Sequence, residues 1–198
     1  MPSFAPRMRI GLFGGSFNPA HEGHRLVALQ CLKRLQLDAV WLLVSPGNPL
    51  KDHAQLQPLA TRVDQTREVM NHHPAIAVTG FEAERGFQYS YQTLEFLTAA
   101  APETRFVWIM GSDNLIDFDR WERWEEIARL LPMAIYARPG AALKAPLSKA
   151  ATALAGFRLP EEAAETLAER SPPVWVYLHG VMSEQSSTAI RQTSQSSK

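Results

Sequence analysis

This sequence lacks the features that mark disulfide-rich, membrane-spanning or nucleic-acid-binding proteins. Its 198 residues contain one cysteine, Cys31, which cannot form an internal disulfide bond. No apolar run approaches membrane-spanning length, and the N-terminus has no signal-peptide core. Twenty basic and twenty acidic side chains cancel, so no overall field attracts a nucleic-acid backbone or an anionic membrane. We therefore expect a cytoplasmic protein without nucleic-acid or membrane partners, in which any phosphate site is local.

Both common phosphate-binding loops are also missing. The early glycines do not fit G-x-G-x-x-G, and G-x-x-x-x-G-K-[ST] does not occur. Residues 14–24 (GGSFNPAHEGH) follow an apolar run at 10–13, and we interpret them as strand end, glycine turn and helix start. Gly14 and Gly15 would let a ligand approach the backbone, and the first N–H groups of a helix favour phosphate. We therefore predict an ATP-phosphate site at Gly14, Gly15, Ser16 and Phe17.

His21 and His24 lie three residues apart, on one face of the first turn of the predicted helix. Both imidazoles could then address the same bound group, so we predict the reaction centre here. Two other interpretations exist. Metal ligation is disfavoured, because the spacing differs from H-E-x-x-H and Cys31 supplies no thiolate cluster. Alternatively, the two histidines could simply cap a helix.

These residues resemble the signature G-G-[ST]-F-[DN]-P-x-H-x-G-H of the nucleotidyltransferases related to class I aminoacyl-tRNA synthetases. Residues 186–191 (SSTAIR) resemble the second signature of that superfamily, S-x-T-x-x-R. Over almost its whole length the chain is similar to the bacterial nicotinate-nucleotide adenylyltransferases, although Asn18 stands where many members have aspartate. The resemblance implies transfer of AMP from ATP to nicotinate mononucleotide in NAD biosynthesis, yielding nicotinate adenine dinucleotide and pyrophosphate. It also implies Mg²⁺ carried with ATP, in a monomer or homo-oligomer.

The wider pattern predicts an α/β protein with a Rossmann-like, doubly wound parallel sheet and helices on both faces. We expect a single domain over 1–198, with a loose leader at 1–6, an alanine-rich variable insert at 141–171 and a polar tail at 192–198. The insert could form short helices or be mobile. Cys31 belongs to an apolar helical stripe and is expected in the core. The expected strands are 8–13, 39–44, 76–79, 105–110, 133–137 and 174–178, and the expected helices follow 24, span 59–71, start at 90 and span 121–131.

Several polar residues follow expected strands, at the edge where open α/β sheets bind ligands. Lys51 lies in the loop after the second strand, Gly111 and Asp113 end the fourth, and Arg138 ends the fifth. The resemblance implies that Lys51 contacts nucleotide phosphates and that Asp113 contacts the nucleotide. Arg138 could reach phosphate with its planar guanidinium. The alternatives are a solvated lysine, helix capping by Asp113 and a surface salt bridge at Arg138.

The resemblance assigns the remaining site residues. Ser186, Thr188 and Arg191 would hold the β- and γ-phosphates of ATP, with Lys51 and Arg191 joining the two histidines in catalysis. After an expected loop at 81–88, Tyr89 and Ser90 would receive the nicotinate carboxylate at a helix N-terminus, with Ser90 as a possible N-cap. Trp121 would stack on the nicotinate ring.

Other functions remain open at this point. The acceptor could be nicotinamide mononucleotide. It could also be phosphopantetheine, although that family usually carries threonine where this chain has His21. A non-catalytic nucleotide-binding module on the same fold is a further possibility, because fold does not dictate activity.

Overall fold

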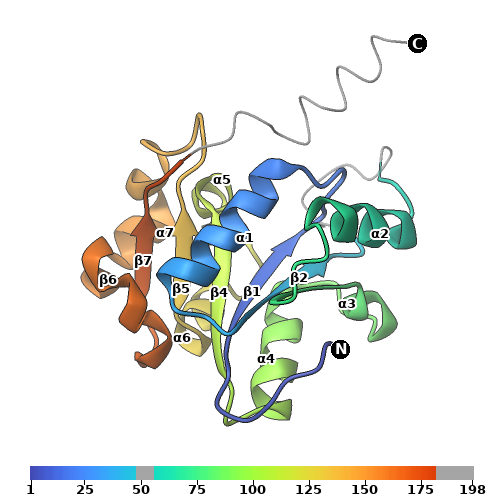
Figure 1. Ribbon diagram of the computed structural model, residues 1–198. Helices are drawn as coiled ribbons and strands as arrows, with labels where there is room; N and C mark the ends of the chain where they lie inside the picture. The colour runs from blue at the N-terminus through green and yellow to red at the C-terminus, as the bar shows by residue number, and fades with distance from the viewer. Residues whose placement is uncertain (48–55, 182–198) are drawn as a thin grey trace.

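The computed structural model describes residues 1–47 and 56–181. Seven parallel strands form one sheet in the order β3-β2-β1-β4-β5-β7-β6 (Figure 1). The strands are β1 (Arg9–Gly15), β2 (Ala39–Val44), β3 (Ile76–Thr79), β4 (Arg105–Gly111), β5 (Met133–Tyr136), β6 (Arg158–Leu159) and β7 (Trp175–Leu178). The expected α/β class and doubly wound parallel sheet are confirmed.

Helices cover both faces of this sheet. The α-helices are α1 (Glu22–Arg34), α2 (Leu59–Val69), α3 (Phe81–Glu84), α4 (Ser90–Ala100), α5 (Ser112–Ile116), α6 (Trp124–Leu130) and α7 (Lys149–Ala153). The 3-10 helices are η1 (Phe118–Arg120), η2 (Ala145–Leu147), η3 (Ala155–Phe157) and the longer η4 (Glu161–Glu169). Within the described ranges, none of these helices combines the length and apolar character needed to cross a membrane.

The strands separate two hydrophobic cores because successive side chains of a strand point to opposite faces. On one face, Leu12 of β1 packs with α4 and α6. On the other face, Phe13 packs with α1, α2 and η4. Cys31 of α1 is fully buried in this second core, and burial raises the pKa of its thiol to about 12. Cys31 is therefore core, as its place in the apolar stripe predicts.

The strand order indicates where a ligand of this kind of fold binds. From β1 the chain fills one side of the sheet with β2 and β3, and it then returns to β4 on the other side of β1. Ligands of open α/β sheets bind beyond the carboxyl ends of the strands at such a reversal. The residues that follow β1 and β4 therefore face the expected binding crevice.

The predicted glycine turn is wrong in one detail. Gly14 and Gly15 are the last residues of β1 and pair with Leu43 and Val44 of β2, so the turn itself starts at Ser16. Gly14 is needed for close packing, because a Cβ there would lie 2.4 Å from Cη2 of Trp108. The missing side chain lets the indole of Trp108 pack directly beneath the end of β1.

Three local predictions also need correction. The segment 81–88, expected as a loop, includes α3, in which Phe81 is buried and Glu82 accepts a hydrogen bond from Thr93 of α4 (2.7 Å). The N-cap of α4 is Tyr89, so Ser90 is the first helical residue. Helix α6 starts at Trp124 rather than at 121, because Arg123 has a left-handed backbone (φ 54°) that separates it from η1.

The alanine-rich segment 141–171 folds as short helices with the edge strand β6 between η3 and η4. Helix η4 packs against β4 and β7 of the sheet, whereas η2 and α7 pack against α5. Ala145 and Ala150 are fully buried in one core, and Ala164 is buried in the other.

Candidate active site

Helix α1 begins with a reciprocal capping arrangement of the two histidines. The N–H of Gly23 donates to Nδ1 of His21 (3.1 Å), and the N–H of His21 donates to Nδ1 of His24 (3.2 Å). The capping that the sequence left as an alternative is therefore present. Because both Nδ1 atoms accept hydrogen bonds, each neutral ring carries its proton on Nε2. The cap thus sets the tautomer and leaves an N–H donor on each ring.

Both imidazoles are held in the neutral form. Burial lowers the pKa of His21 from 6.5 to about 4, with a further contribution from the positive charge of Arg138 and an opposing one from Asp113. The pKa of His24 also lies well below its usual value, because of burial first, then His21 and Arg138. Within the described part of the chain, Nε2 of His21 is buried and has no hydrogen-bond partner. A buried donor without an acceptor is costly, which points to a ligand atom as the missing partner.

Aromatic packing fixes the two rings relative to the turn after β1. The ring centroids of His21 and His24 are 3.9 Å apart. Phe17 packs edge-on against His24 with centroids 4.9 Å apart, and it also packs against Phe13 (5.6 Å). Phe17 has a left-handed backbone (φ 44°), which is uncommon outside glycine and must be held by its surroundings.

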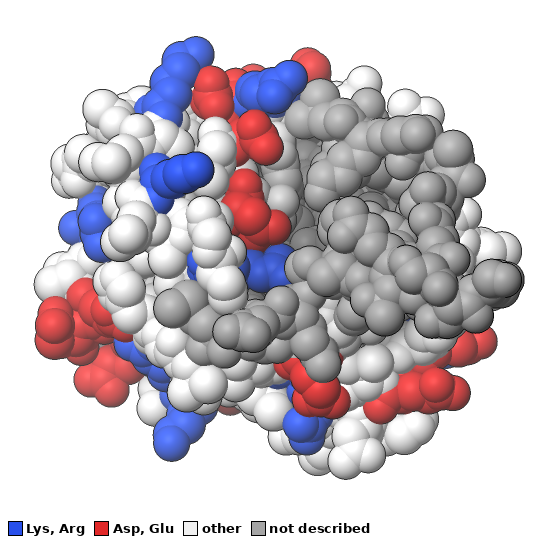
Figure 2. Space-filling model, turned by 90° about the horizontal axis from the view of Figure 1, so that it is seen from above, with Lys and Arg blue, Asp and Glu red and all other residues white. Residues whose placement is uncertain are grey.

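The ends of β4 and β5 contribute an ion pair beside the histidines. Nη1 of Arg138 lies 3.3 Å from Oδ2 of Asp113, and the Arg138 N–H donates to Oγ of Ser112 (2.9 Å). A Cβ at Gly111 would lie 2.4 Å from Oδ1 of Asp113, so glycine makes room for the pair. The salt-bridge alternative for Arg138 is therefore present, whereas Asp113 does not cap α5, whose N-cap is Gly111. Seen from above, acidic and basic side chains lie next to one another near the middle of the described surface (Figure 2).

The residues expected to bind nicotinate lie on the face of the sheet covered by α4 and α6. Trp121, between η1 and α6, is half-buried and packs edge-on against Trp108 (6.4 Å between centroids), whose ring lies beneath Gly14. The guanidinium of Arg123 stacks over Tyr91 of α4 (4.4 Å) and connects the two helices. These contacts place Trp121 and the start of α4 on one side of the end of β1.

The N-terminus of α4 already uses part of its donor capacity. The N–H of Tyr89 donates to Oε1 of Gln92 (3.0 Å). The first-turn N–H groups of Ser90 and Tyr91 have no acceptor within a helix. The N–H groups of Ser90 and Tyr91 are therefore placed to receive a carboxylate, and the expected contact with Tyr89 stays a prediction.

Four of the expected residues lie outside the described part of the chain. One described residue next to the candidate site was not expected there from the sequence. Lys51, Ser186, Thr188 and Arg191 are the four outside. Arg62 of α2, by contrast, is 1% exposed and donates to the carbonyl of Ser16 in the turn after β1 (2.7 Å), although sequence reasoning did not single it out. The one feature of the sequence that could have indicated burial of Arg62 is its position next to Val63, which faces inward.

Comparisons with known proteins identify the family of this chain. Residues 12–193 match the cytidylyltransferase-like family. A probable nicotinate-nucleotide adenylyltransferase of Methylorubrum extorquens is 54% identical over 184 residues, which cover 93% of this chain and 99% of that protein. One of Brucella abortus is 48% identical over 185 residues, with 93% and 95% covered. The fold resembles Plasmodium falciparum nicotinic acid mononucleotide adenylyltransferase complexed with NaAD, with a TM-score of 0.70, 16% identity and coverage of 94% and 83%. The chain belongs to the nicotinate-nucleotide adenylyltransferases, within the cytidylyltransferase-like family.

Proposed function

We propose that this chain transfers the adenylyl group of ATP to nicotinate mononucleotide, in NAD biosynthesis. The observation that carries the proposal is the pair of buried, neutral imidazoles at the start of α1. Backbone N–H groups occupy both Nδ1 atoms, and the buried Nε2–H of His21 has no acceptor in the described structure. Phosphate oxygens are the acceptors that such donors fit, and the relatives bear the name of this reaction.

The reaction needs no protein nucleophile. A phosphate oxygen of nicotinate mononucleotide attacks the α-phosphorus of ATP in line. The bond from the α-phosphorus to the bridging oxygen of the β-phosphate breaks, and its electron pair leaves with pyrophosphate. The product is nicotinate adenine dinucleotide. Catalysis then consists of positioning the two phosphates and stabilising the charge that develops on them.

The residues of this chain divide that work. His21 and His24 donate from Nε2 to oxygens of the transferring and leaving phosphates. The backbone of Gly14, Gly15, Ser16 and Phe17 borders the triphosphate, and Arg138 supplies positive charge beside it. Asp113, which follows β4 just beyond Gly111, would accept hydrogen bonds from the ribose hydroxyls. By family likeness, Lys51, Ser186, Thr188 and Arg191 contact the remaining phosphate oxygens.

Mg²⁺ is proposed to arrive as part of the nucleotide substrate. Across 1–47 and 56–181, no three His, Cys, Asp or Glu side chains gather as a metal cage. The ion would instead be held chiefly by phosphate oxygens and water, which is the usual mode for Mg²⁺ in phosphoryl transfer. The ion would neutralise charge on the triphosphate, while the protein orients the nucleotide.

The acceptor is proposed to be the acid rather than the amide. The N–H groups of Ser90 and Tyr91 at the start of α4 would bind the nicotinate carboxylate through charge-assisted hydrogen bonds, each worth about 1.5–3 kcal/mol. Trp121 would stack on the positively charged pyridinium, with a cation–π gain of about 0.5–2 kcal/mol. One such carboxylate bond corresponds to about a tenfold or greater preference in kcat/KM.

Pyrophosphate release tests reaction and acceptor together. Purified protein with ATP and Mg²⁺ would be offered nicotinate mononucleotide, nicotinamide mononucleotide or phosphopantetheine in parallel. We expect fast release with the first and at least about tenfold lower kcat/KM with the second. Equal rates with both mononucleotides would overturn the carboxylate assignment. ATP binding by calorimetry without pyrophosphate release from any acceptor would favour the non-catalytic module instead.

A further inference from the structure

Arg62 of α2 is a buried arginine whose hydrogen bonds to the described residues all go to backbone carbonyls. Its side chain is 1% exposed. Nη1 donates to the carbonyls of Ser16 (2.7 Å) and Ser45 (2.8 Å), and Nε donates to the carbonyl of Gln57 (2.9 Å). Nη2 lies 3.4 Å from the carbonyl of Pro46. One guanidinium thus connects the turn after β1, the end of β2 and the approach to α2.

These acceptors are unusual partners for a buried charge. Among the described residues, no carboxylate forms an ion pair with Arg62, although its near neighbour Arg67 pairs with Asp64 (3.0 Å). Burial lowers the pKa of the Arg62 guanidinium, which reflects the cost of removing its charge from water. An apolar residue in this place would leave these buried carbonyls without a donor, which is also costly. We therefore attribute the burial of this arginine to the three chain segments that its planar guanidinium holds together.

The contact with Ser16 leads directly to the histidines. The Ser16 carbonyl belongs to the peptide unit that precedes Phe17, whose left-handed backbone (φ 44°) needs external support. The ring of Phe17 packs edge-on against the imidazole of His24, with centroids 4.9 Å apart. Arg62 therefore fixes the peptide that orients Phe17, and Phe17 borders one of the two proposed phosphate donors.

A second connection joins the same segments. The N–H of Gln57 donates to Oδ1 of Asn18 (3.1 Å), while the Gln57 carbonyl accepts from Arg62. In addition, the N–H of Ser45 donates to the carbonyl of Gly15 (2.9 Å). The end of β2 and the residues before α2 are thus bonded to both ends of the turn after β1, and Arg62 lies at the point where they meet.

We propose that Arg62 is a positioning residue for adenylyl transfer, which holds the turn after β1 so that Phe17 keeps the His24 imidazole in its working position. This inference rests on the proposed function. It predicts that loss of the guanidinium reduces the rate of the chemical step more than it weakens acceptor binding, because the acceptor ring is assigned to Trp121 on the other face of the sheet.

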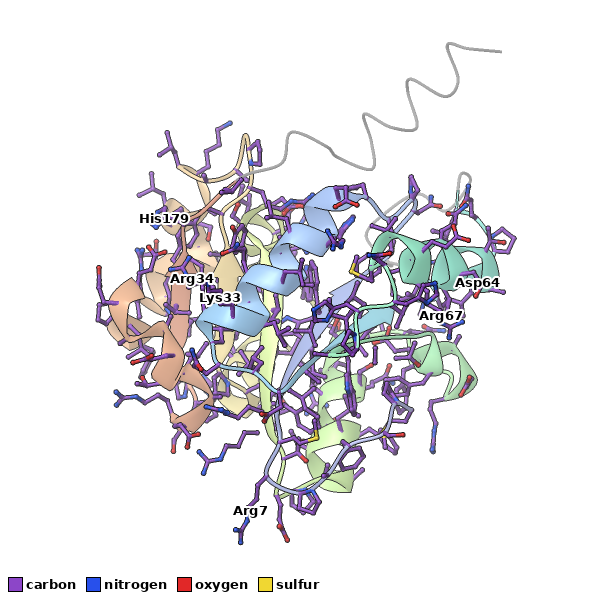
Figure 3. The ribbon with its side chains drawn as sticks, viewed as in Figure 1. Arg7, Lys33, Arg34, Asp64, Arg67 and His179 are labelled. Atoms are coloured by element: carbon purple, nitrogen blue, oxygen red, sulfur yellow. The ribbon has the colours of Figure 1, made fainter. Side chains whose placement is uncertain are left out.

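The test compares Arg62→Met and Arg62→Lys with the control variant Arg67→Met. Arg67 lies on the same helix and pairs with Asp64 (Figure 3), and its side chain is half exposed. For each protein, circular dichroism would give the folded fraction, and pyrophosphate release would give kcat per folded molecule and KM for both substrates. We expect kcat to fall by about 10- to 100-fold in Arg62→Met. Arg62→Lys should fall less, KM for nicotinate mononucleotide should change less than kcat, and Arg67→Met should match wild type.

Chemical rescue separates positioning from a purely structural role. Methylguanidinium added to Arg62→Ala should restore turnover at least severalfold, whereas it should do nothing for His24→Ala. A readout that does not depend on activity is the ¹⁵N NMR signature of the His24 ring, which should show the single Nε2–H tautomer in wild type and a tautomer mixture in Arg62→Met.

The outcomes distinguish the two proposals. A folded Arg62→Met with wild-type kcat and an unchanged His24 tautomer would overturn the positioning role. If Arg62→Met does not fold, Arg62→Lys with wild-type kcat and tautomer would overturn it equally. Wild-type protein that releases no pyrophosphate with any acceptor would refute the proposed function, and the NMR comparison would then decide the role of Arg62 alone.

Discussion

Lowering the pH from 7 to 5 should destabilise the wild-type protein more than a His21→Asn variant. Asparagine is among the preferred N-cap residues, and its side-chain oxygen can accept the Gly23 N–H as Nδ1 of His21 does. It does not titrate, however. The variant therefore keeps the helix cap and the carboxylates of the wild type and removes one buried imidazole that resists protonation.

The magnitude follows from the pKa of His21 in the two states. Folding lowers this pKa from 6.5 to about 4, so at acidic pH the unfolded chain binds more protons than the folded protein does. The stability associated with the neutral ring is present above pH 6.5 and is lost as the pH falls towards 4. At pH 5 the loss amounts to about 2 kcal/mol relative to pH 7, and it reaches about 3 kcal/mol near pH 4.

Urea unfolding followed by tryptophan fluorescence measures this difference. The free energy of unfolding would be determined for both proteins at pH 7, 6 and 5. The gap between them should change by about 2 kcal/mol in favour of the variant as the pH falls. His24 is present in both proteins, and burial, the first cause of its lowered pKa, is retained. Parallel curves over this range would mean that His21 titrates normally in the folded protein, which would contradict the buried capping geometry.

Three further substitutions test other parts of the site. His24→Ala should lower kcat for pyrophosphate release by at least about a hundredfold, as loss of one transition-state donor typically does, and normal turnover would remove His24 from the mechanism. Trp121→Ala should raise KM for nicotinate mononucleotide by about 2- to 30-fold, the equivalent of a cation–π contact, whereas an unchanged KM would assign Trp121 to packing alone. Gly14→Ala should lower the free energy of unfolding by about 1–3 kcal/mol, because the added Cβ would lie 2.4 Å from Cη2 of Trp108. Adding Trp108→Leu to Gly14→Ala should recover part of that loss. Urea unfolding of the single and the double variant measures this, and an equal or lower stability of the double variant would contradict the predicted clash.

Strand positions could be predicted well because burial leaves a simple pattern. Strands β2 and β3 occupy the expected residues 39–44 and 76–79. Strand β2 lies between two neighbours and is covered on both faces, so its run of apolar residues is continuous. The capping position of His21 and the closeness of the two imidazoles could likewise be anticipated, since both follow from their spacing at a helix start.

The errors occur where the chain changes direction and several conformations fit the same residues. Gly14 and Gly15 suit a turn, yet they complete β1, because the ring of Trp108 occupies the space where a side chain would stand. Trp121 continues the apolar spacing of α6, but the left-handed backbone of Arg123 separates it from that helix. Neither the contact across the sheet nor the sign of φ leaves a trace in local periodicity.

Two features of the site depend on contacts that only the folded chain provides. The neutral, Nε2-protonated state of the histidines follows from two backbone N–H groups and from burial, and composition determines neither. Arg62 lies beside Val63, in a helix whose buried positions are otherwise apolar or hydroxyl-bearing, and its charge argued for exposure. Its place inside becomes favourable once backbone carbonyls from separate segments converge on it, since each of them loses water and needs a donor. In both cases the backbone of the turns around β1 defines what the side chains can do, so the turn after β1 belongs to the candidate active site even where it contributes no reactive side chain.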